Sequence, residues 1–229
     1  MYKTFSKNIL HWHKKNGRHN LPWQTQNSAY HIWLSEIMLQ QTQVTTVIPY
    51  FNKFINVFPN ISAVAAADLD EILKLWAGLG YYARARNMHR CAGIITTKFG
   101  GKFPSTEEEL LSLPGIGAYT AAAIRAIAFD KPAVVVDVNI ERVIARLYNV
   151  REPISHVKPQ VRRLASSLMS SKRPGDWAQA LMDLGATVCK PKSPDCDSCP
   201  WKNKCVAKAL GSASKIPLRL PKPKRPTRY

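Results

Sequence analysis

The sequence has few acidic residues and no long apolar run. It carries 15 Asp and Glu against 33 Lys and Arg, so its formal net charge is +18. No apolar run approaches the roughly 20 residues that span a bilayer, and the segment Met1 to Lys7 lacks the apolar core of a signal peptide. We therefore expect a cytoplasmic, nucleoid-associated location in a bacterium. The basic excess favours nucleic acid as the partner, with a solvated basic surface or a membrane-surface role as alternatives.

Strand signals and internal repeats are also nearly absent. Val134 to Val136 is the only clear β-branched run, and no unit of about 20–50 residues recurs. Apolar residues recur instead at helical spacing, which predicts helices within residues 5–15, 30–43, 46–58, 69–76, 83–99, 120–129, 141–148, 158–169 and 177–187. Ser105 to Glu108 has the pattern of a capping box, which predicts a short helix leading into Leu113. The expected fold class is all-α.

Cysteine is scarce except in one segment near the C-terminal end. Cys91 stands alone and is interpreted as a core residue, whereas four cysteines follow one another at Cys189, Cys196, Cys199 and Cys205. In a cytosolic chain such a group indicates a metal site rather than disulfides. Four thiolates can hold either one tetrahedral zinc ion or an iron–sulfur cluster, and the spacing alone does not separate the two.

A glycine-rich turn precedes the most apolar helix of the chain. Leu113-Pro114-Gly115-Ile116-Gly117 has two glycines two residues apart, which permit a tight turn with several backbone N–H groups on one side. The positive end of the following helix would add to the attraction for a phosphate. A plain loop between two packed helices explains the glycines equally well.

Two carboxylates stand in positions where an acid is unusual. Glu36 interrupts the apolar segment Ile32 to Leu39, and burial there would raise its pKa and suit a general acid. An exposed glutamate on a polar face is the simpler interpretation. Asp137 follows Val134 to Val136 and precedes a helix, a pattern more typical of an N-cap than of a catalyst. The two roles are compatible, because an N-cap carboxylate stays ionised near its helix end.

Glutamine and aromatic residues occupy two further turns. Gln40 to Gln43 lies at a helix end, and Tyr81-Tyr82 follows Gly78-Leu79-Gly80 beside a basic helix. Exposed side chains of these types suit an enzyme that opens a duplex and holds it open. Ordinary turn and core residues would show the same pattern.

Taken together, these motifs resemble one family over nearly the whole chain, from about residue 5 to residue 215. The segment Leu113 to Thr120, followed by Asp137, resembles the helix–hairpin–helix and aspartate of the endonuclease III superfamily of DNA glycosylases. The segments that resemble the MutY-type adenine DNA glycosylases in particular are 21–23, 33–44, 76–86 and 182–186. In that superfamily the cysteine spacing belongs to a loop with a 4Fe-4S cluster, so the resemblance favours the cluster over zinc.

The resemblance implies an enzyme that flips out adenine mispaired with 8-oxoguanine or guanine in double-stranded DNA and cleaves its N-glycosidic bond. It further implies a monomer with no membrane partner. Glu36 would protonate the adenine and later help to activate water, while ionised Asp137 would stabilise the oxocarbenium-like sugar. Asn139 would hydrogen-bond near these carboxylates. Hydrolysis of this bond requires no redox step.

The residue type at position 119, here Tyr119, distinguishes two branches of the family. In the bifunctional lyase branch this position is a lysine that forms a Schiff base with the sugar. The tyrosine here has no amine for that attack, so the resemblance implies a monofunctional glycosylase. Tyr119 would then orient the sugar side of the site.

The remaining implied contacts lie on the turns. Gln41 and Tyr81 would penetrate the base stack, with Thr42 and Leu79 beside them. Backbone amides around Gly115 and Gly117 would bind a DNA phosphate, and Trp23 and Gln24 would line the adenine pocket.

The expected organisation has two domains and a tail. Residues 29–132 would form a six-helix bundle with the hairpin, and residues 1–28 plus 133–215 would form the cluster domain. Residues 216–229, rich in Pro and Lys, are interpreted as a linker or tail. The family usually has glycine where Val138 stands and a MutT-like domain after the linker, so a slower reaction and weaker discrimination of 8-oxoguanine are expected.

Two other functions stay open at this point. A thymine glycosylase of the same superfamily, acting on G·T mismatches, also lacks the extra domain and carries tyrosine in the hairpin. A damage-binding module without activity is the other alternative, although Glu36 and Asp137 argue against it.

Overall fold

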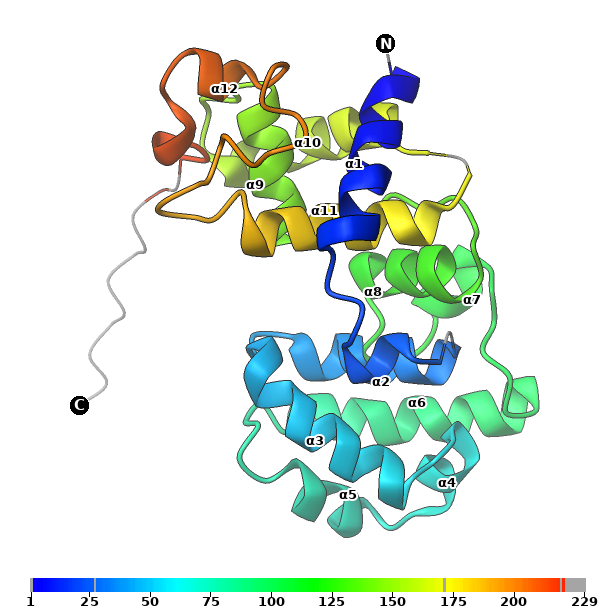
Figure 1. Ribbon diagram of the computed structural model, residues 1–229. Coiled ribbons are helices and arrows are strands. Elements are labelled where there is room, and N and C mark those ends of the chain that lie inside the picture. Colours follow the sequence, from blue (N-terminus) through cyan, green and yellow to red (C-terminus); the bar gives the residue numbers. More distant parts are fainter. Residues whose placement is uncertain (1, 27, 171, 219, 221–229) are drawn as a thin grey trace. The chain divides into compact units, whose positions relative to one another are not determined.

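The computed structural model describes residues 2–26, 28–170, 172–218 and 220. The chain forms two compact units, each discontinuous in sequence (Figure 1). The bundle unit comprises Arg18–Val135 and Ser171–Ala178. The cysteine unit comprises Met1–Gly17, Val136–Ser170 and Gln179–Tyr229.

The bundle unit is built from short helices joined by tight turns. In order they are η1 (Pro22–Gln24), α2 (Ala29–Leu39), α3 (Val44–Val57), α4 (Ile61–Ala66), α5 (Leu69–Trp76), α6 (Ala83–Phe99), α7 (Glu107–Leu111), α8 (Ala118–Ala123) and the π-helical η2 (Ile124–Ala128). Helix α2 contacts η1, α3, α6, α8 and η2, whereas α4 and α5 pack on α6. The central position of α2 follows from its composition, because a helix that is apolar on every side buries its whole surface.

Two sequence predictions in this unit need correction. The helix predicted over residues 30–43 ends at Leu39, with Gln40 as its C-cap. The predicted capping box lies one residue further along than expected. Thr106, not Ser105, is the N-cap of α7, and its hydroxyl accepts from the backbone N–H of Glu109. Thr106 has the extended backbone that an N-cap requires, and this conformation cannot be read from the letters alone.

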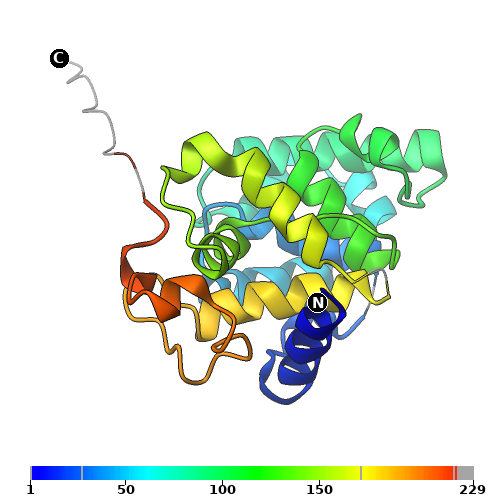
Figure 2. The same cartoon turned by 90° about the horizontal axis from the view of Figure 1, so that it is seen from above.

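The cysteine unit combines several helices with a long irregular segment. Its helices are α1 (Tyr2–Asn16), α9 (Val138–Leu147), α10 (Ile154–Leu168), the second half of α11 (Pro174–Thr187), α12 (Val206–Ala209) and the 3-10 turn η3 (Ala213–Lys215). Helix α9 packs against α10 and α12, and α10 also contacts α1. The segment between α11 and α12, drawn in orange, is mostly irregular and carries the four clustered cysteines (Figure 2).

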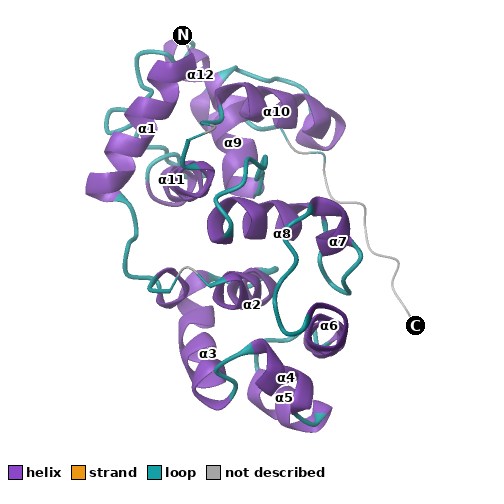
Figure 3. Cartoon of the chain, turned by 90° about the vertical axis from the view of Figure 1, so that its right-hand side faces the viewer, coloured by secondary structure: helices purple, strands orange, loops and turns teal. Residues whose placement is uncertain are grey.

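The described residues contain helices and loops but no strand, as the all-α prediction requires (Figure 3). The β-branched run Val134 to Val136 is irregular. None of the helices in the described ranges has both the length and the apolar character that a bilayer crossing demands.

The compact units differ from the predicted domains at three places. Residues 18–28, 133–135 and 171–178 pack with the bundle unit. Whether either unit is an independent domain stays a prediction. Most of the predicted tail, residue 219 and residues 221–229, lies outside the described residues.

Candidate active site and cysteine cluster

Asp137 is held rigidly at the start of α9. Its backbone is extended, and its Oδ1 accepts a hydrogen bond of 2.7 Å from the backbone N–H of Ile140. The other carboxylate oxygen, Oδ2, accepts from the side-chain amide of Asn139, also at 2.7 Å. The N-cap interpretation of Asp137 is therefore confirmed. A half-buried carboxylate with both oxygens engaged keeps one orientation, which is what a charge-stabilising group needs.

The pKa of Asp137 reflects opposing causes. Desolvation by burial raises the pKa above its ordinary value, while the hydrogen bonds from Ile140 and Asn139 and the charge of Arg142 lower it. The next residue, Val138, is 61% exposed, so most of its side chain is accessible to solvent.

Arg142 connects the Asp137 end of α9 to the cysteine segment. Its Nη2 donates to the side-chain oxygen of Asn139 at 2.9 Å and to the carbonyl of Gly185 at 2.7 Å. Its Nε donates to the carbonyl of Cys189 at 2.8 Å. A continuous chain of hydrogen bonds therefore runs from Asp137 through Asn139 and Arg142 to the first clustered cysteine.

Glu36 is the acidic residue of the buried helix α2, with an exposed fraction of 8%. Residues Tyr30 to Met38 around it are all buried, which rules out the simpler interpretation of a glutamate on a polar face. Helix α2 packs against η1 and against α8, the helix that carries Tyr119. Glu36 belongs to the bundle unit and Asp137 to the cysteine unit.

The glycine-rich turn has the geometry of a hairpin between α7 and α8. Gly115 has a φ of +79°, and a Cβ there would lie 3.0 Å from the Cβ of Asn87, so only glycine fits. Gly117 is the N-cap of α8, and both glycines are exposed. The backbone N–H groups at the start of α8 therefore face outward from an accessible helix end. Tyr119, in the first turn of α8, is half-buried.

Two exposed turns carry the residues expected to enter a base stack. Gln41 has a φ of 60° and Tyr81 a φ of 50°, left-handed conformations that are strained for residues other than glycine. Tyr81 is 59% exposed and Gln41 is also exposed. Leu79 is buried, whereas Thr42 is half-buried. Strain at an exposed position is typical of functional turns.

Arg84 joins these two turns and was missed as a site residue by the sequence analysis. Its Nη1 donates to the carbonyls of Ile37, Met38 and Gln40 at 2.7–2.9 Å. Its Nη2 donates to the hydroxyl of Thr42 and to the carbonyls of Leu79 and Gly80 at 3.1–3.3 Å. The guanidinium also lies 5.5 Å from the ring centre of Tyr81. The only hint in the sequence was an arginine four residues after Gly80, which is not specific.

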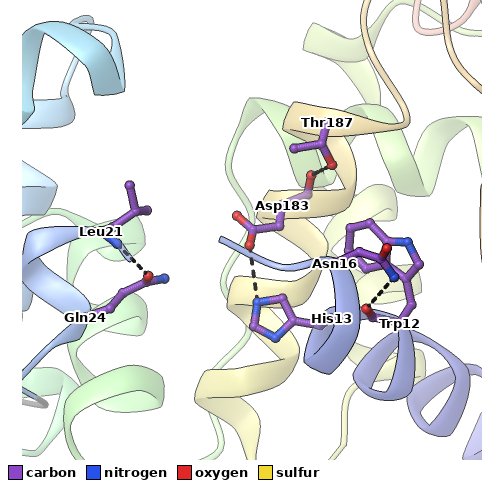
Figure 4. A network of polar contacts seen from close by, with 7 residues as sticks. All are labelled: Trp12, His13, Asn16, Leu21, Gln24, Asp183 and Thr187. Atoms are coloured by element: carbon purple, nitrogen blue, oxygen red, sulfur yellow. Dashed lines mark hydrogen bonds and ion pairs between the residues drawn. The ribbon is translucent and has the colours of Figure 1, made fainter. Parts of the chain in front are cut away.

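Trp23 and Gln24 form the turn η1 in the bundle unit. Trp23 is buried and packs edge-on against Phe51, with ring centres 5.4 Å apart. The side-chain oxygen of Gln24 accepts from the backbone N–H of Leu21 at 3.4 Å (Figure 4). The turn is therefore well defined, but the pocket role of these residues stays a prediction.

The four clustered cysteines carry free thiols and line one cavity. Cys189, Cys196, Cys199 and Cys205 surround a space of about 300 Å³ that is partly open to solvent. Arg146, Lys202 and Lys208 lie on the same wall. Burial is the main cause that raises the pKa of Cys199 to about 12, with smaller contributions from the neighbouring cysteines.

This donor set fits a cationic group shared by four thiolates. Four thiols on one cavity would repel one another if ionised, and a bound metal centre would remove that cost. As the side chains are placed, no three His, Cys, Asp or Glu residues of the described chain are grouped so that they could hold a metal ion. Cys91, by contrast, is fully buried in α6, as expected for a core residue.

The geometry agrees with a match to a known protein family. The family of HhH-GPD superfamily base excision DNA repair proteins matches residues 34–170, more than half of the chain. The chain belongs to the HhH-GPD superfamily. The matched span includes the buried Glu36, the hairpin and Asp137, while the cysteine segment lies beyond it.

Curated relatives within this superfamily are substantially longer than the chain. The chain is 44% identical over 202 residues to the adenine DNA glycosylase of Buchnera aphidicola subsp. Baizongia pistaciae, a match that covers 88% of this chain and 58% of the relative. It is 42% identical over 215 residues to the adenine DNA glycosylase of Mus musculus, covering 89% of this chain and 42% of the relative. The chain thus spans about half the length of these relatives.

A solved structure described as a thermostable thymine-DNA glycosylase has a similar HhH-GPD fold. The two chains superpose with a TM-score of 0.82 at 28% sequence identity, covering 91% of this chain and 97% of the other. The likeness extends over both units and shows that the fold continues well beyond the family match.

Proposed function

We propose that the chain excises adenine from double-stranded DNA as a base excision repair glycosylase, acting on adenine opposite 8-oxoguanine or guanine. The observation that carries the proposal is the carboxylate of Asp137, held by Ile140 and Asn139 at the start of α9. The 40–44% identity to relatives named adenine DNA glycosylase supports adenine as the base. The charge of +18 supports a DNA partner.

Glu36 and Asp137 divide the chemistry between them in this proposal. Adenine leaves poorly until it is protonated, and Glu36 in the buried helix α2 supplies the proton. Bond cleavage leaves positive charge on the sugar, which ionised Asp137 stabilises. Water then attacks the sugar, with Glu36 taking up the proton. Asn139 keeps Asp137 oriented through its hydrogen bond.

The turns hold the DNA around the extruded base. Gln41 and Tyr81 fill the space that the adenine vacates, with Thr42 and Leu79 beside them, and Trp23 and Gln24 line its pocket. The outward N–H groups near Gly115 and Gly117 bind a backbone phosphate. Tyr119 has no amine for a Schiff base, so the product is an abasic site without strand cleavage.

The cysteine cavity holds a 4Fe-4S cluster in the proposal, with Cys189, Cys196, Cys199 and Cys205 as ligands. When bound, the cluster supplies a structural cross-link that orders the segment between α11 and α12. Lys202 and Lys208 would then face the DNA backbone as an ordered basic surface. A cytoplasmic location and a monomeric state complete the proposal.

Single-turnover cleavage of mismatched duplexes tests the proposal. The duplexes carry adenine opposite 8-oxoguanine, adenine opposite guanine, or thymine opposite guanine, and alkali reveals abasic sites. We expect release of adenine, with strand breaks only after alkali treatment. Breaks before alkali would contradict the role given to Tyr119, and binding without any release would leave a damage-binding module.

Thymine excision from G·T mismatches is the second candidate. The structural likeness to a thymine-DNA glycosylase, at a TM-score of 0.82, favours it. Release of thymine in the same duplex panel would move the assignment to this activity.

Replacing Arg84 by lysine should impair the reaction without removing a charge. The planar fork of arginine serves six oxygen atoms on two turns, and a lysine ammonium cannot reach all of them. Gln41 and Tyr81 would then be misplaced, and the single-turnover rate should fall by about 100-fold. Exposed Arg86 on the same helix, changed to lysine, is the matched control. Equal rates for the two variants would contradict the positioning role of Arg84.

A further inference from the structure

A second basic surface lies along α1. Lys7, Asn8, His11, Trp12, Lys15 and Asn16 line an open cavity together with Pro200 of the cysteine segment. All seven belong to the cysteine unit. The cavity encloses about 860 Å³, including the part open to solvent. None of these described lining residues is acidic, so the cavity is suited to an anion.

The helical repeat of α1 sorts these residues into two parallel rows. Lys7, His11 and Lys15 follow one another at intervals of four residues, which places successive side chains about 6 Å apart. Asn8, Trp12 and Asn16 form the adjacent row with the same interval. A row of cations therefore runs beside a row with an aromatic ring at its centre.

The opposite side of α1 is fixed to the core of the cysteine unit. Phe5 and Ile9 are buried, and the ring of Phe5 packs edge-on against Trp201 at 5.5 Å. The Nε2 of buried His13 lies 3.2 Å from a carboxylate oxygen of buried Asp183 of α11 (Figure 4). The side-chain amide of Asn16 donates to the carbonyl of Trp12 at 3.1 Å. The contacts of Phe5, Ile9 and His13 set the rotation of α1 and keep the two rows turned to the cavity.

We propose that this α1 groove binds a single strand of nucleic acid outside the excision site. Lys7, His11 and Lys15 would contact successive phosphates, and a base would stack on the half-exposed ring of Trp12. Grooves that bind single strands combine a basic track for the backbone with aromatic rings for the bases. The indole favours a single strand over a duplex, because a paired base offers no free face for stacking.

An acidic segment of a protein partner is the competing occupant. Its carboxylates would pair with the lysines, but the ring of Trp12 would have no specific role in binding it. The excision site needs only one duplex, so the groove adds a capacity that the proposed function does not require.

Binding of a fluorescent oligothymidylate of about 12 nucleotides tests the proposal, because this strand contains no adenine. Fluorescence anisotropy of the oligonucleotide is measured with the full chain carrying Asp137→Asn, which prevents adenine release. A saturating concentration of unlabelled A·G duplex is present to occupy the excision site. We expect the strand to bind alongside the duplex. Trp12→Ala should weaken this binding about tenfold, and Lys15→Ala several-fold. Complete displacement of the strand by the duplex would overturn the proposal.

Matched variants separate the groove from general charge. Exposed Lys14 adjoins Lys15 in sequence but does not line the cavity, so Lys14→Ala should leave strand binding nearly unchanged. Trp12→Phe should retain most of the strand binding, because phenylalanine keeps an aromatic ring. Each α1 variant, made without the Asp137→Asn change, should release adenine at the parental rate, which shows that the variant is folded. Equal losses for Lys14→Ala and Lys15→Ala would overturn the proposal. A poly-glutamate peptide that bound as tightly as the strand, and whose binding Trp12→Ala did not change, would also overturn the proposal.

Discussion

Replacing Asp137 by asparagine is expected to lower the rate of adenine release by about 10⁴-fold. Asparagine has the same size, and its side-chain oxygen can still accept from the N–H of Ile140, so α9 keeps its cap. What is lost is the negative charge that stabilises the developing sugar cation, together with the oxygen that accepts from the amide of Asn139. Single-turnover kinetics on an adenine·8-oxoguanine duplex measure the loss, and anisotropy checks that mismatch binding is retained.

The control for this prediction removes a carboxylate elsewhere. Asp130 is exposed and has a φ of 48°, a conformation that asparagine also tolerates. Asp130→Asn should therefore react at the parental rate. A rate for Asp137→Asn within about tenfold of the parent would show that the charge at this position does not carry the chemistry.

The second large effect is expected from Arg146→Met. Arg146 is 2% exposed, and its guanidinium donates to the carbonyls of Lys190, Pro191 and Ile216 at 2.7–2.8 Å and to that of Cys189 at 3.2 Å. Methionine fills much of the volume but cannot donate to these buried and part-buried oxygens, although the carbonyl of Cys189 still accepts from the Nε of Arg142. The free energy of unfolding should fall by about 3–5 kcal/mol, measured by urea denaturation monitored by circular dichroism.

The same variant reports on the cysteine cavity. Arg146 holds the three carbonyls of residues 189–191, and its Nη1 lies 3.4 Å from the sulfur of Cys189. Iron bound per chain should therefore fall together with stability. Exposed Arg151→Met is the control and should change stability by no more than about 0.5 kcal/mol. Equal stabilities of the two variants would contradict the structural role of Arg146.

Some contacts followed from the sequence because they depend on near neighbours along the chain. The hydrogen bonds of Asp137 reach only Asn139 and Ile140, two and three residues away. Such spacing follows from the repeat of a helix and the rule for its N-cap. The glycine at 115 is likewise explained by the turn it occupies. Helices such as 69–76 and 83–99 could be predicted to the residue, because apolar periodicity and terminal glycines are local signals.

Other features could not be predicted because their partners are far apart in sequence. Arg84 contacts Ile37, Met38 and Gln40, more than 40 residues earlier, and Arg146 contacts Ile216, 70 residues later. In the sequence both are ordinary arginines of a basic chain. Burial decides their roles, since a guanidinium away from water must find oxygen partners, and only the fold brings the right carbonyls around it.

The sequence by itself therefore determined the helical class, the local geometry at Asp137 and the glycine turn, because each depends on residues within one or two turns of the chain. Only the tertiary structure decided that Glu36 is buried, that Arg84 holds two turns together and that α1 presents a basic groove beside Pro200. The physical reason is that burial and long-range hydrogen bonds are properties of packing. The same residue types occur in many sequences whose folds do not provide the tertiary contacts that define these roles.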